Sequence, residues 1–270
     1  MSARHYRRAA AGIARRELLR MFKQKGRLAA ALVRPLIWLA IFAAGFRTVL
    51  GLSIMPPYQT YVLYEVYIVP GLVGMMLLFY AMQSSLSMVY DREMGSMRTL
   101  LVAPLPRWFL LGARLLANTL AAIPLVYVFL FAARLWEVRP PWPGYVAIFP
   151  ALLLAGLMLG AFGLLLSSFV RQLENFAGVM NFAIVPMFFA STALYPLWRL
   201  SDASPWLAWV AVFNPFTHAV EMIRFALYLR LEPAALAMTA ASALVFFGLA
   251  VLAYDPGRGL WSRREPGGFT

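Results

Sequence analysis

Few side chains in this sequence have the chemistry to bind a metal ion or to act as a nucleophile. The 270 residues include no cysteine and only two histidines, His5 and His218, which excludes disulfides, thiolate ligands and cysteine nucleophiles. His218 and Glu221 are three residues apart, a spacing that would place both on one face of a helix. A zinc site needs a third protein ligand, so a structural hydrogen bond is the favoured role of His218 and no metal site is predicted.

The sequence also lacks the residues that usually bind and hydrolyse ATP. Its two lysines, Lys23 and Lys25, do not end a G-x-x-x-x-G-K phosphate loop. No long apolar stretch contains a Ser–His pair, paired aspartates or a cluster of metal ligands, one of which an intramembrane enzyme would need. We therefore expect no catalytic residues and no cofactor bound by this chain, and any ATP must be hydrolysed by another chain.

The composition is that of an integral membrane protein. Hydrophobic residues make up 62% of the chain and charged residues 13%, whereas a soluble domain has about 45–50% and about 25%. Too few polar residues remain to cover a surface that faces water, which excludes a soluble enzyme. The net charge is +13, and ten of the 24 basic residues lie in the first 34 positions, directly before an apolar stretch. This placement favours contact with anionic lipids over nucleic acid.

Six apolar stretches are long enough to cross a bilayer as helices, which takes about 20 residues each. They cover residues 33–52, 66–87, 108–131, 145–169, 175–197 and 234–254. The predicted fold class is therefore an all-α integral membrane protein with six transmembrane helices in one domain, residues 33–254. Arg47, near the outer end of the first span, is interpreted as a snorkelling side chain.

The basic residues predict the orientation of these spans. Six spans place both termini on the same side of the membrane. If that side is the inside, 18 basic residues lie inside and 6 lie outside. Because basic residues concentrate in cytoplasmic segments, both termini are predicted to be cytoplasmic, including the tail at 255–270.

The N-terminal residues 1–32 are predicted to form an amphipathic basic helix on the inner membrane surface. Arg16, Arg20, Lys23 and Arg27 recur at spacings of four, three and four residues and so share one helical face. The Arg34–Pro35 pair is expected to break the chain between this helix and the first span, because a residue before proline avoids the helical conformation.

Two further segments fit neither a span nor a simple turn. Residues 90–104, after the second span, are charged at their start and apolar at their end. This pattern suits either a short cytoplasmic helix parallel to the membrane or an ordinary loop. Residues 198–232, between the fifth and sixth spans, predict one or two short helices that dip into the outer leaflet and pack against protein.

The second of these segments contains a clear helix start. Asn214 precedes Pro215, which is typical of an N-cap followed by proline in the first turn. A helix is therefore predicted from residue 215 to about residue 229. Glu221 and Arg224, three residues apart, are expected to pair on its surface.

The fourth span has small residues on one face, at Gly156, Gly160 and Gly163. Small residues let helix backbones approach closely in membranes. This face therefore predicts tight helix packing, either within the chain or across a dimer. Asn118, in the third span, is expected to form an interhelical hydrogen bond.

Segments 90–104 and 198–232 resemble two signature sequences of the permeases of ABC-2 type exporters. The first contains Asp91-Arg92-Glu93-Met94-Gly95-Ser96, then Leu100-Leu101 and Pro104; the second contains Asn214-Pro215-Phe216-Thr217-His218-Ala219-Val220-Glu221-Met222-Ile223-Arg224. Their order and spacing, together with the six spans, extend the resemblance over nearly the whole chain. Ser96 stands where the family more often has threonine.

This resemblance implies the membrane-spanning permease subunit of an ATP-binding cassette exporter in the bacterial inner membrane. Two permease subunits, expected to be a homodimer, would form the pathway. Two copies of a separate ATP-binding subunit would bind ATP and Mg²⁺. The coupling helix seated in that subunit would comprise Asp91, Arg92, Glu93, Met94, Gly95, Ser96, Met97, Arg98 and Thr99. The outer motif would comprise Asn214, Pro215, Glu221 and Arg224.

A narrower resemblance concerns the cargo. The run from Tyr67 to Gly71, with the run from Gln172 to Asn181, is similar to a subgroup associated with periplasmic quinoprotein (PQQ-dependent) alcohol oxidation. This similarity implies a cargo related to alcohol or aldehyde metabolism.

The alternative function is an ATP-independent secondary transporter or channel. Such a protein would have interrupted helices at corresponding positions of two halves and an ion site near the midplane of the membrane. Corresponding interruptions are not evident in the sequence, which favours the exporter.

Overall fold

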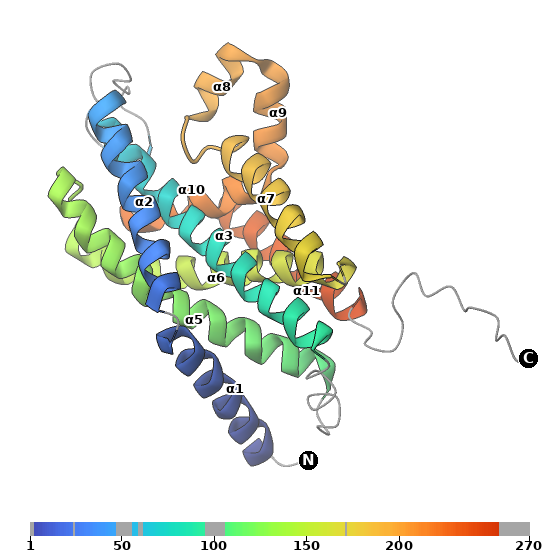
Figure 1. Cartoon of the computed structure of the whole chain (residues 1–270). Helices are drawn as coiled ribbons and strands as arrows, with labels where there is room; N and C mark the ends of the chain where they lie inside the picture. The colour runs from blue at the N-terminus through green and yellow to red at the C-terminus, as the bar shows by residue number, and fades with distance from the viewer. Residues whose placement is uncertain are drawn as a thin grey trace, which may run out of the picture.

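The computed structural model describes residues 3–23, 25–46, 56–58, 62–94, 106–170 and 172–253, and the regular elements in these ranges are helices (Figure 1). In chain order they are α1 (Ala3–Lys23), α2 (Lys25–Phe46), α3 (Tyr64–Glu93), α5 (Arg107–Ala133), η1 (Arg134–Trp136), α6 (Trp142–Phe169), α7 (Leu173–Phe189), α8 (Leu197–Ala203), α9 (Pro205–Phe213), α10 (Pro215–Leu227) and α11 (Pro233–Ala253). The predicted all-α class is confirmed for the part of the chain that the structure describes.

Among the residues that the structure describes, four helical stretches are long and apolar enough to cross a membrane. They are Tyr64–Asp91, Arg107–Trp136, Trp142–Phe169 and Pro233–Ala253, at the positions of the predicted second, third, fourth and sixth spans. Two shorter apolar helices, Ala29–Gly45 and Leu173–Phe189, lie where the first and fifth spans were expected. The six-span arrangement as a whole stays a prediction.

The predicted fifth span is too long at its end, because α7 stops at Phe189. The side-chain amide of Asn214 donates hydrogen bonds to the carbonyls of Met187 (2.8 Å) and Ala190 (2.7 Å). Carbonyls in the last turn of a helix have no partner within that helix. The amide therefore satisfies the end of α7, and the chain turns at residues 190–195 instead of continuing outward.

The predicted helix break at Arg34–Pro35 is wrong. α2 begins at Lys25 and runs through Pro35, so the boundary between α1 and α2 lies earlier in the chain. Proline is tolerated inside a membrane helix when neighbouring helices compensate for the lost backbone hydrogen bond. Pro35 is buried against such neighbours. α1 itself packs along α5, where the Tyr6 and Phe109 rings meet edge to face at 4.9 Å.

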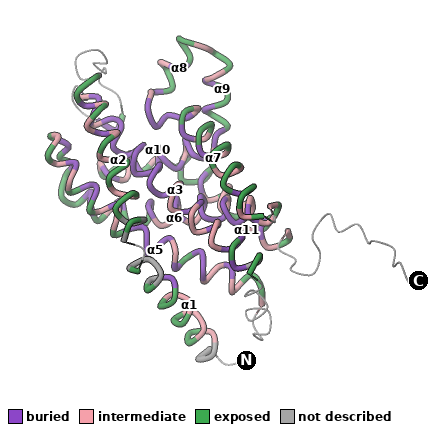
Figure 2. Tube along the Cα trace, in the orientation of Figure 1, coloured by how far each residue is buried: buried purple, intermediate pink, exposed green. Residues whose placement is uncertain are grey.

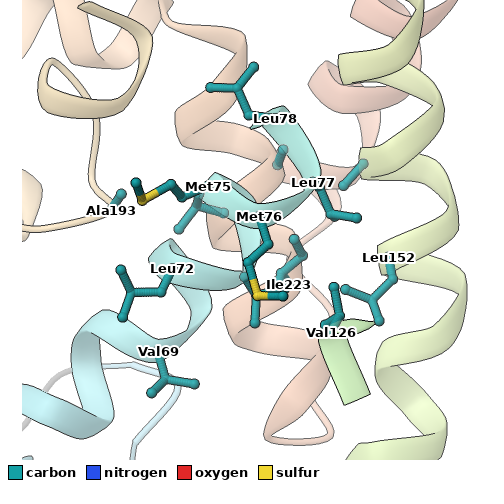
Figure 3. Close-up of a cluster of buried hydrophobic side chains, with 14 of the residues drawn as sticks. Val69, Leu72, Met75, Met76, Leu77, Leu78, Val126, Leu152, Ala193 and Ile223 are labelled. Atoms are coloured by element: carbon teal, nitrogen blue, oxygen red, sulfur yellow. The ribbon is translucent and has the colours of Figure 1, made fainter. Parts of the chain in front are cut away.

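α3 lies at the centre of the bundle. It packs against α2, α5, α6, α7 and α10, and it is buried along most of its length (Figure 2). Figure 3 shows Met76 and Leu77 of α3 on the side of Val126 of α5, Leu152 of α6 and Ile223 of α10, and Met75 on the side of Ala193, all members of one hydrophobic core. Because close van der Waals packing is what associates helices in lipid, α3 is the element to which α2, α5, α6, α7 and α10 are fixed.

Three short helices, α8, α9 and α10, form the segment between α7 and α11, where the sequence predicted one or two. α8 and α9 stand at the top of Figure 1, whereas α10 packs against α3, α6 and α11. Phe216, Val220 and Ile223 of α10 are fully buried. α10 is therefore part of the core and not a surface helix.

Candidate functional site

An ion-pair cluster joins the ends of three helices, beside the predicted coupling segment. Its members are Glu17 of α1, Asp91 of α3 and Arg114 of α5, whose side chains are 4%, 9% and 6% exposed. Arg114 contacts the carboxylates of Asp91 at 3.1 Å and Glu17 at 3.4 Å, and donates a hydrogen bond to the Ser87 hydroxyl at 2.8 Å. Arg16 adds a contact of 3.4 Å to Asp91. We call Glu17, Asp91 and Arg114 the cytoplasmic cluster, after the side of the membrane that the sequence predicts for this end of α3.

The cytoplasmic cluster changes the interpretation of Asp91. The sequence assigned Asp91 to a coupling helix in contact with another chain, but its carboxylate is buried and bound to Arg114 within this one. The predicted coupling helix over 91–99 also does not begin as a helix separate from α3, because Asp91, Arg92 and Glu93 are the last residues of α3. Gly95, Ser96, Met97, Arg98 and Thr99 lie outside the described residues.

Glu93 joins α3 to α7. Its Oε2 accepts a hydrogen bond of 3.3 Å from the backbone N–H of Leu173, the first residue of α7. A carboxylate is favourable there because the N-terminus of a helix carries partial positive charge and unpaired N–H groups. The two acidic residues that were expected to face a partner therefore hold the end of α3 against α5 and α7.

Two apolar side chains at the same end of α3 remain exposed. Met94 is 64% exposed and Tyr90 is 47% exposed. Within the described part of the chain, neither side chain forms a hydrogen bond, an ion pair or an aromatic contact. Together with the exposed Glu93, they form the surface that is available to another protein at the start of segment 90–104.

The outer motif forms the N-cap that its sequence predicted. The Asn214 Oδ1 accepts a hydrogen bond of 3.0 Å from the backbone N–H of Phe216, and Pro215 is the first residue of α10. Because the amide of Asn214 also satisfies the end of α7, this one side chain both ends α7 and begins α10.

The predicted pair of Glu221 and Arg224 forms, but it is not on a surface. Arg224 is fully buried, and the Glu221 side chain is 24% exposed. Arg224 donates to the Glu221 carboxylate and to the carbonyl of Thr192 at 3.0 Å. Its guanidinium lies over the Tyr67 ring, 4.1 Å from the centroid, an attractive cation–π contact. The expectation of a surface pair fails because α10 is packed inside the bundle.

Arg224 belongs to a set of contacts that hold the turn at residues 190–195. We call these contacts the outer anchor, after the side of the membrane that the sequence predicts for this segment. The hydroxyls of Tyr64 and Tyr67, both on α3, donate to the carbonyls of Leu194 (3.0 Å) and Thr192 (2.8 Å). Between them the backbone of Ala193 approaches Gly71 so closely that a Cβ at Gly71 would lie 2.3 Å from the Ala193 oxygen. Tyrosines and glycine on one helix, and arginine on another, thus fix one turn.

Tyr58, just before α3, extends the outer anchor. Its ring meets the Tyr228 ring edge to face at 4.7 Å, and its hydroxyl donates to the carbonyl of Val66 at 3.4 Å. Burial raises the pKa of the Tyr58 phenol to about 12. The hydroxyl therefore stays protonated, as a hydrogen-bond donor, throughout the physiological pH range.

The small-residue face of α6 packs within the chain. A Cβ at Gly156 would lie 2.4 Å from the Thr119 methyl, and one at Gly160 would lie 2.3 Å from a methyl of Leu115, both on α5. A Cβ at Gly163 would lie 2.5 Å from the Ser85 hydroxyl on α3. The three glycines therefore let α6 approach α5 and α3, the intrachain alternative of the prediction.

The atoms that lie nearest to each glycine predict how strongly an alanine substitution at that position destabilises the protein. Gly71→Ala would strike a backbone oxygen, which cannot move away, and is expected to destabilise the protein by about 1–3 kcal/mol. Gly160→Ala strikes the tip of a leucine side chain and should cost less. Gly248→Ala, where no atom lies within 4 Å, should be neutral or slightly stabilising. Thermal unfolding in one detergent measures the order; equal effects at Gly71 and Gly248 would contradict it.

The predicted role of His218 agrees with the structure, whereas the predicted role of Asn118 does not. The Nε2 of His218 lies 2.8 Å from the carbonyl of Val212, so its structural role is confirmed. No group of three His, Cys, Asp or Glu side chains suited to a metal occurs among the described residues. Asn118 forms no interhelical hydrogen bond within the described ranges. It lines a cavity between α2, α3 and α5 instead.

Sequence reasoning missed two features of these sites. Glu17 stands in a strongly basic stretch, and its buried partner Arg114 is far away in sequence; the neighbouring Arg16 is 75 positions from Asp91. The role of Tyr67 in the outer anchor had no local signal either, because its partners come from the turn at 190–195 and from α10. Arg114, a basic residue inside an apolar stretch, was the available indication of a buried ion pair.

Comparison with known sequences adds a family assignment to this geometry. Residues 10–228 match the sequence family described as ABC-2 type transporter. This range includes the cytoplasmic cluster, the small-residue face of α6 and the outer anchor with α10.

Individual relatives agree with the family match. The chain is 30% identical over 204 residues to a transport permease, ycf38, of Cyanophora paradoxa, covering 73% of this chain and 67% of that one. It is 26% identical over 220 residues to ycf38 of Porphyra purpurea, covering 79% and 72%. It is also 30% identical over 165 residues to the multidrug ABC transporter permease YbhR of Escherichia coli (strain K12), covering 60% and 43%.

Proposed function

The chain belongs to the ABC-2 type transporter family, and on that premise we propose that it is the membrane-spanning permease subunit of an ATP-binding cassette exporter. A transport permease role follows from the family and its relatives. In the proposed complex two copies of this chain form the pathway, and two copies of a separate ATPase subunit bind ATP and Mg²⁺. The protein lies in the bacterial inner membrane with six spans and both termini in the cytoplasm.

The observation that carries the proposal is the continuity of α3. This helix runs unbroken for 30 residues, about 45 Å at 1.5 Å per residue. At one end Asp91 and Glu93 tie it to α5 and α7. At the other end Tyr64, Tyr67 and Gly71 contact the turn of the outer anchor. One rigid helix therefore connects the segment expected to meet the ATPase with the outer face.

This connection suggests how nucleotide-driven movement reaches the pathway. When two ATPase subunits close, they displace whatever is seated on them. A displaced start of segment 90–104 moves α3, and α5 and α7 follow because ion pairs and hydrogen bonds join them to it. Rigid-body rotation of helices about packed interfaces is an established form of switching in proteins. The role of Asp91 and Glu93 in this scheme is to transmit movement within the chain.

The proposal predicts that Met94→Arg disrupts binding of the ATPase. Met94 is 64% exposed at the end of α3, so the substitution leaves the fold intact but puts a charge into the proposed contact. We expect co-purification with the ATPase subunit encoded beside this chain to fall by about tenfold or more, because a charge buried in an interface without a partner is costly.

Leu231→Arg is the matched control. Leu231 is 70% exposed and belongs to the segment assigned to the opposite side of the membrane, so its variant should bind as the wild type does. Equal binding of the ATPase by the wild type and by Met94→Arg would show that the ATPase contact does not lie at the end of α3. Failure of the wild type to bind any ATPase, with substrate flux that needs no ATP, would favour the secondary transporter or channel.

A further inference from the structure

The cavity between α2, α3 and α5 changes from polar to apolar along α3. Ser87, Ser84 and Gln83 line its end nearer the cytoplasmic cluster, and Met76 and Met75 line its other end. The opposite wall, on α5, shows the same change from Asn118 to Leu125. A cavity with polar groups at one end and apolar groups at the other fits an amphiphile in one orientation.

The polar end offers hydrogen-bonding groups that the chain does not use. The side-chain amides of Gln83 and Asn118 form no hydrogen bond within the described residues, although both line the cavity. An amide at membrane depth without a partner is unfavourable. Both groups would be satisfied by a ligand that carries hydroxyl or carbonyl oxygens.

Arg34 supplies a cation at this cavity. Its guanidinium lies over the Phe79 ring, 4.5 Å from the centroid, and it forms no ion pair with any described residue. Phe79 is about 18 Å along the α3 axis from Asp91, at 1.5 Å per residue, which places the guanidinium inside the predicted second span. A charged side chain at that depth is costly unless an anion pairs with it.

The other charges at the cavity are already paired. Glu17 lines the polar end, but its carboxylate lies 3.4 Å from the guanidinium groups of both Arg16 and Arg114. Its charge is thus neutralised within the cytoplasmic cluster. The remaining charge at the cavity is that of Arg34, so the ligand is expected to be an anion.

We propose that this cavity holds one anionic phospholipid with a hydroxylated headgroup, which stays bound and is not the transported cargo. The phosphate lies at Arg34, where a guanidinium can donate two parallel hydrogen bonds to it. The headgroup hydroxyls meet Gln83 and Asn118 toward the cytoplasm, and the acyl chain begins beside Met76, whose flexible side chain adapts to it. Basic pockets between helices on the cytoplasmic side are suited to such lipids.

The size of the cavity limits what it can enclose. Its volume is about 50 Å³, several times the roughly 10–15 Å³ that one water needs. It therefore encloses part of the phosphate and headgroup, and the acyl chains lie outside, along α2. Ala30 and Arg34 of α2 are exposed beside the cavity, which leaves a route for them.

The test is native mass spectrometry of the full chain, stripped of lipid and titrated with phosphatidylglycerol or phosphatidylcholine. We expect one tightly bound phosphatidylglycerol per chain and binding of phosphatidylcholine weaker by about tenfold or more. Arg34→Gln and Asn118→Leu should each weaken binding of phosphatidylglycerol by about tenfold, the loss of one strong hydrogen-bonding contact. Asn118→Leu removes no charge, so it separates this cavity from general attraction of lipid to a basic protein.

Arg199→Gln is the matched control, because Arg199 also lies over an aromatic ring, that of Trp198, but on α8. Its variant should bind phosphatidylglycerol as the wild type does. Unchanged binding in Arg34→Gln and Asn118→Leu would overturn the proposal, as would equal binding of phosphatidylcholine. Palmitate that competes as strongly as phosphatidylglycerol would show that the site does not select a phospholipid. The inference rests on the proposed orientation but not on ATP coupling, so a chain that binds no ATPase can still pass this test.

Discussion

Replacing Arg224 with methionine is expected to lower the free energy of unfolding by about 3–5 kcal/mol, the usual cost of removing one partner of a buried ion pair. Arg224 is fully buried, donates to Glu221 and to the carbonyl of Thr192, and lies over the Tyr67 ring. Methionine fills similar space, but it leaves the Glu221 carboxylate without this donor and the Thr192 carbonyl with the Tyr67 hydroxyl alone. Thermal unfolding of the purified protein in one detergent measures the loss.

Three further variants separate the lost ion pair from lost packing. Arg230→Met removes an exposed arginine just after α10 and should leave stability unchanged. Arg224→Lys keeps the charge but loses the fork that reaches Thr192, so its effect should be intermediate. Adding Glu221→Met to Arg224→Met should recover part of the stability, because the unpaired carboxylate is then gone. An Arg224→Met protein as stable as the wild type would contradict the outer anchor.

The same variants also test whether the two ends of α3 have separate roles in ATPase binding and in transport. At a temperature where Arg224→Met is still folded, its binding to the ATPase should be unaffected, because Met94 lies at the other end of the helix. Loss of transport with retained ATPase binding would show that the outer anchor acts after the coupling contact. This result is expected if α3 transmits movement as a rigid rod.

The helix start at Asn214 could be predicted because it depends on neighbours in sequence. An N-cap needs a side-chain oxygen at one position and free N–H groups two or three residues later, and both are visible in the sequence. The second role of Asn214, ending α7, depends on carbonyls 27 and 24 positions away. No local pattern reports such a contact, so the predicted fifth span was too long.

The pairing of Glu221 and Arg224 was predictable but its burial was not. A spacing of three places two side chains together on any helix, whether that helix faces solvent or protein. What buries Arg224 is Tyr67 on α3 and the turn at 190–195, which are distant in sequence. The burial of Asp91 was not predictable either. An acidic residue in a segment predicted to be cytoplasmic is expected to be exposed, and its buried partner Arg114 is distant in sequence.

The Arg34–Pro35 break failed for a different reason. The preference of a residue before proline for extended conformations is a local tendency of the unfolded chain. In α2 the packing of the buried face that includes Pro35 outweighs it. Helices α3 and α5 likewise continue through Pro70 and Pro124. Proline is therefore a weak signal of helix ends in a chain this apolar.

Replacing Arg114 with methionine is expected to destabilise the protein by about 3–5 kcal/mol and to uncouple it from the ATPase. Arg114 is the buried cation that contacts both carboxylates of the cytoplasmic cluster, and both are nearly inaccessible to solvent; Arg16, which is half exposed, also contacts both. Without it, the two carboxylates keep their contacts with the half-exposed Arg16 but lose their buried counter-charge, which is costly. The ends of α1, α3 and α5 then separate, so ATPase binding at Met94 should persist while substrate-stimulated ATP hydrolysis is lost.

Two comparisons show whether the cytoplasmic cluster transmits movement or only stabilises the fold. Arg139→Met, at an exposed arginine between α5 and α6, controls for loss of a basic residue and should change neither stability nor coupling. Asp91→Leu combined with Arg114→Met removes one of the two buried carboxylates and should recover part of the stability. If the ion pair itself transmits movement, coupling should stay low in this double variant although its stability recovers. Coupling would recover only to the extent that apolar packing holds α3 against α5 without the charges. Full loss of coupling in a protein of restored stability would show that the charges are required, whereas normal coupling in Arg114→Met alone would remove the cluster from the pathway.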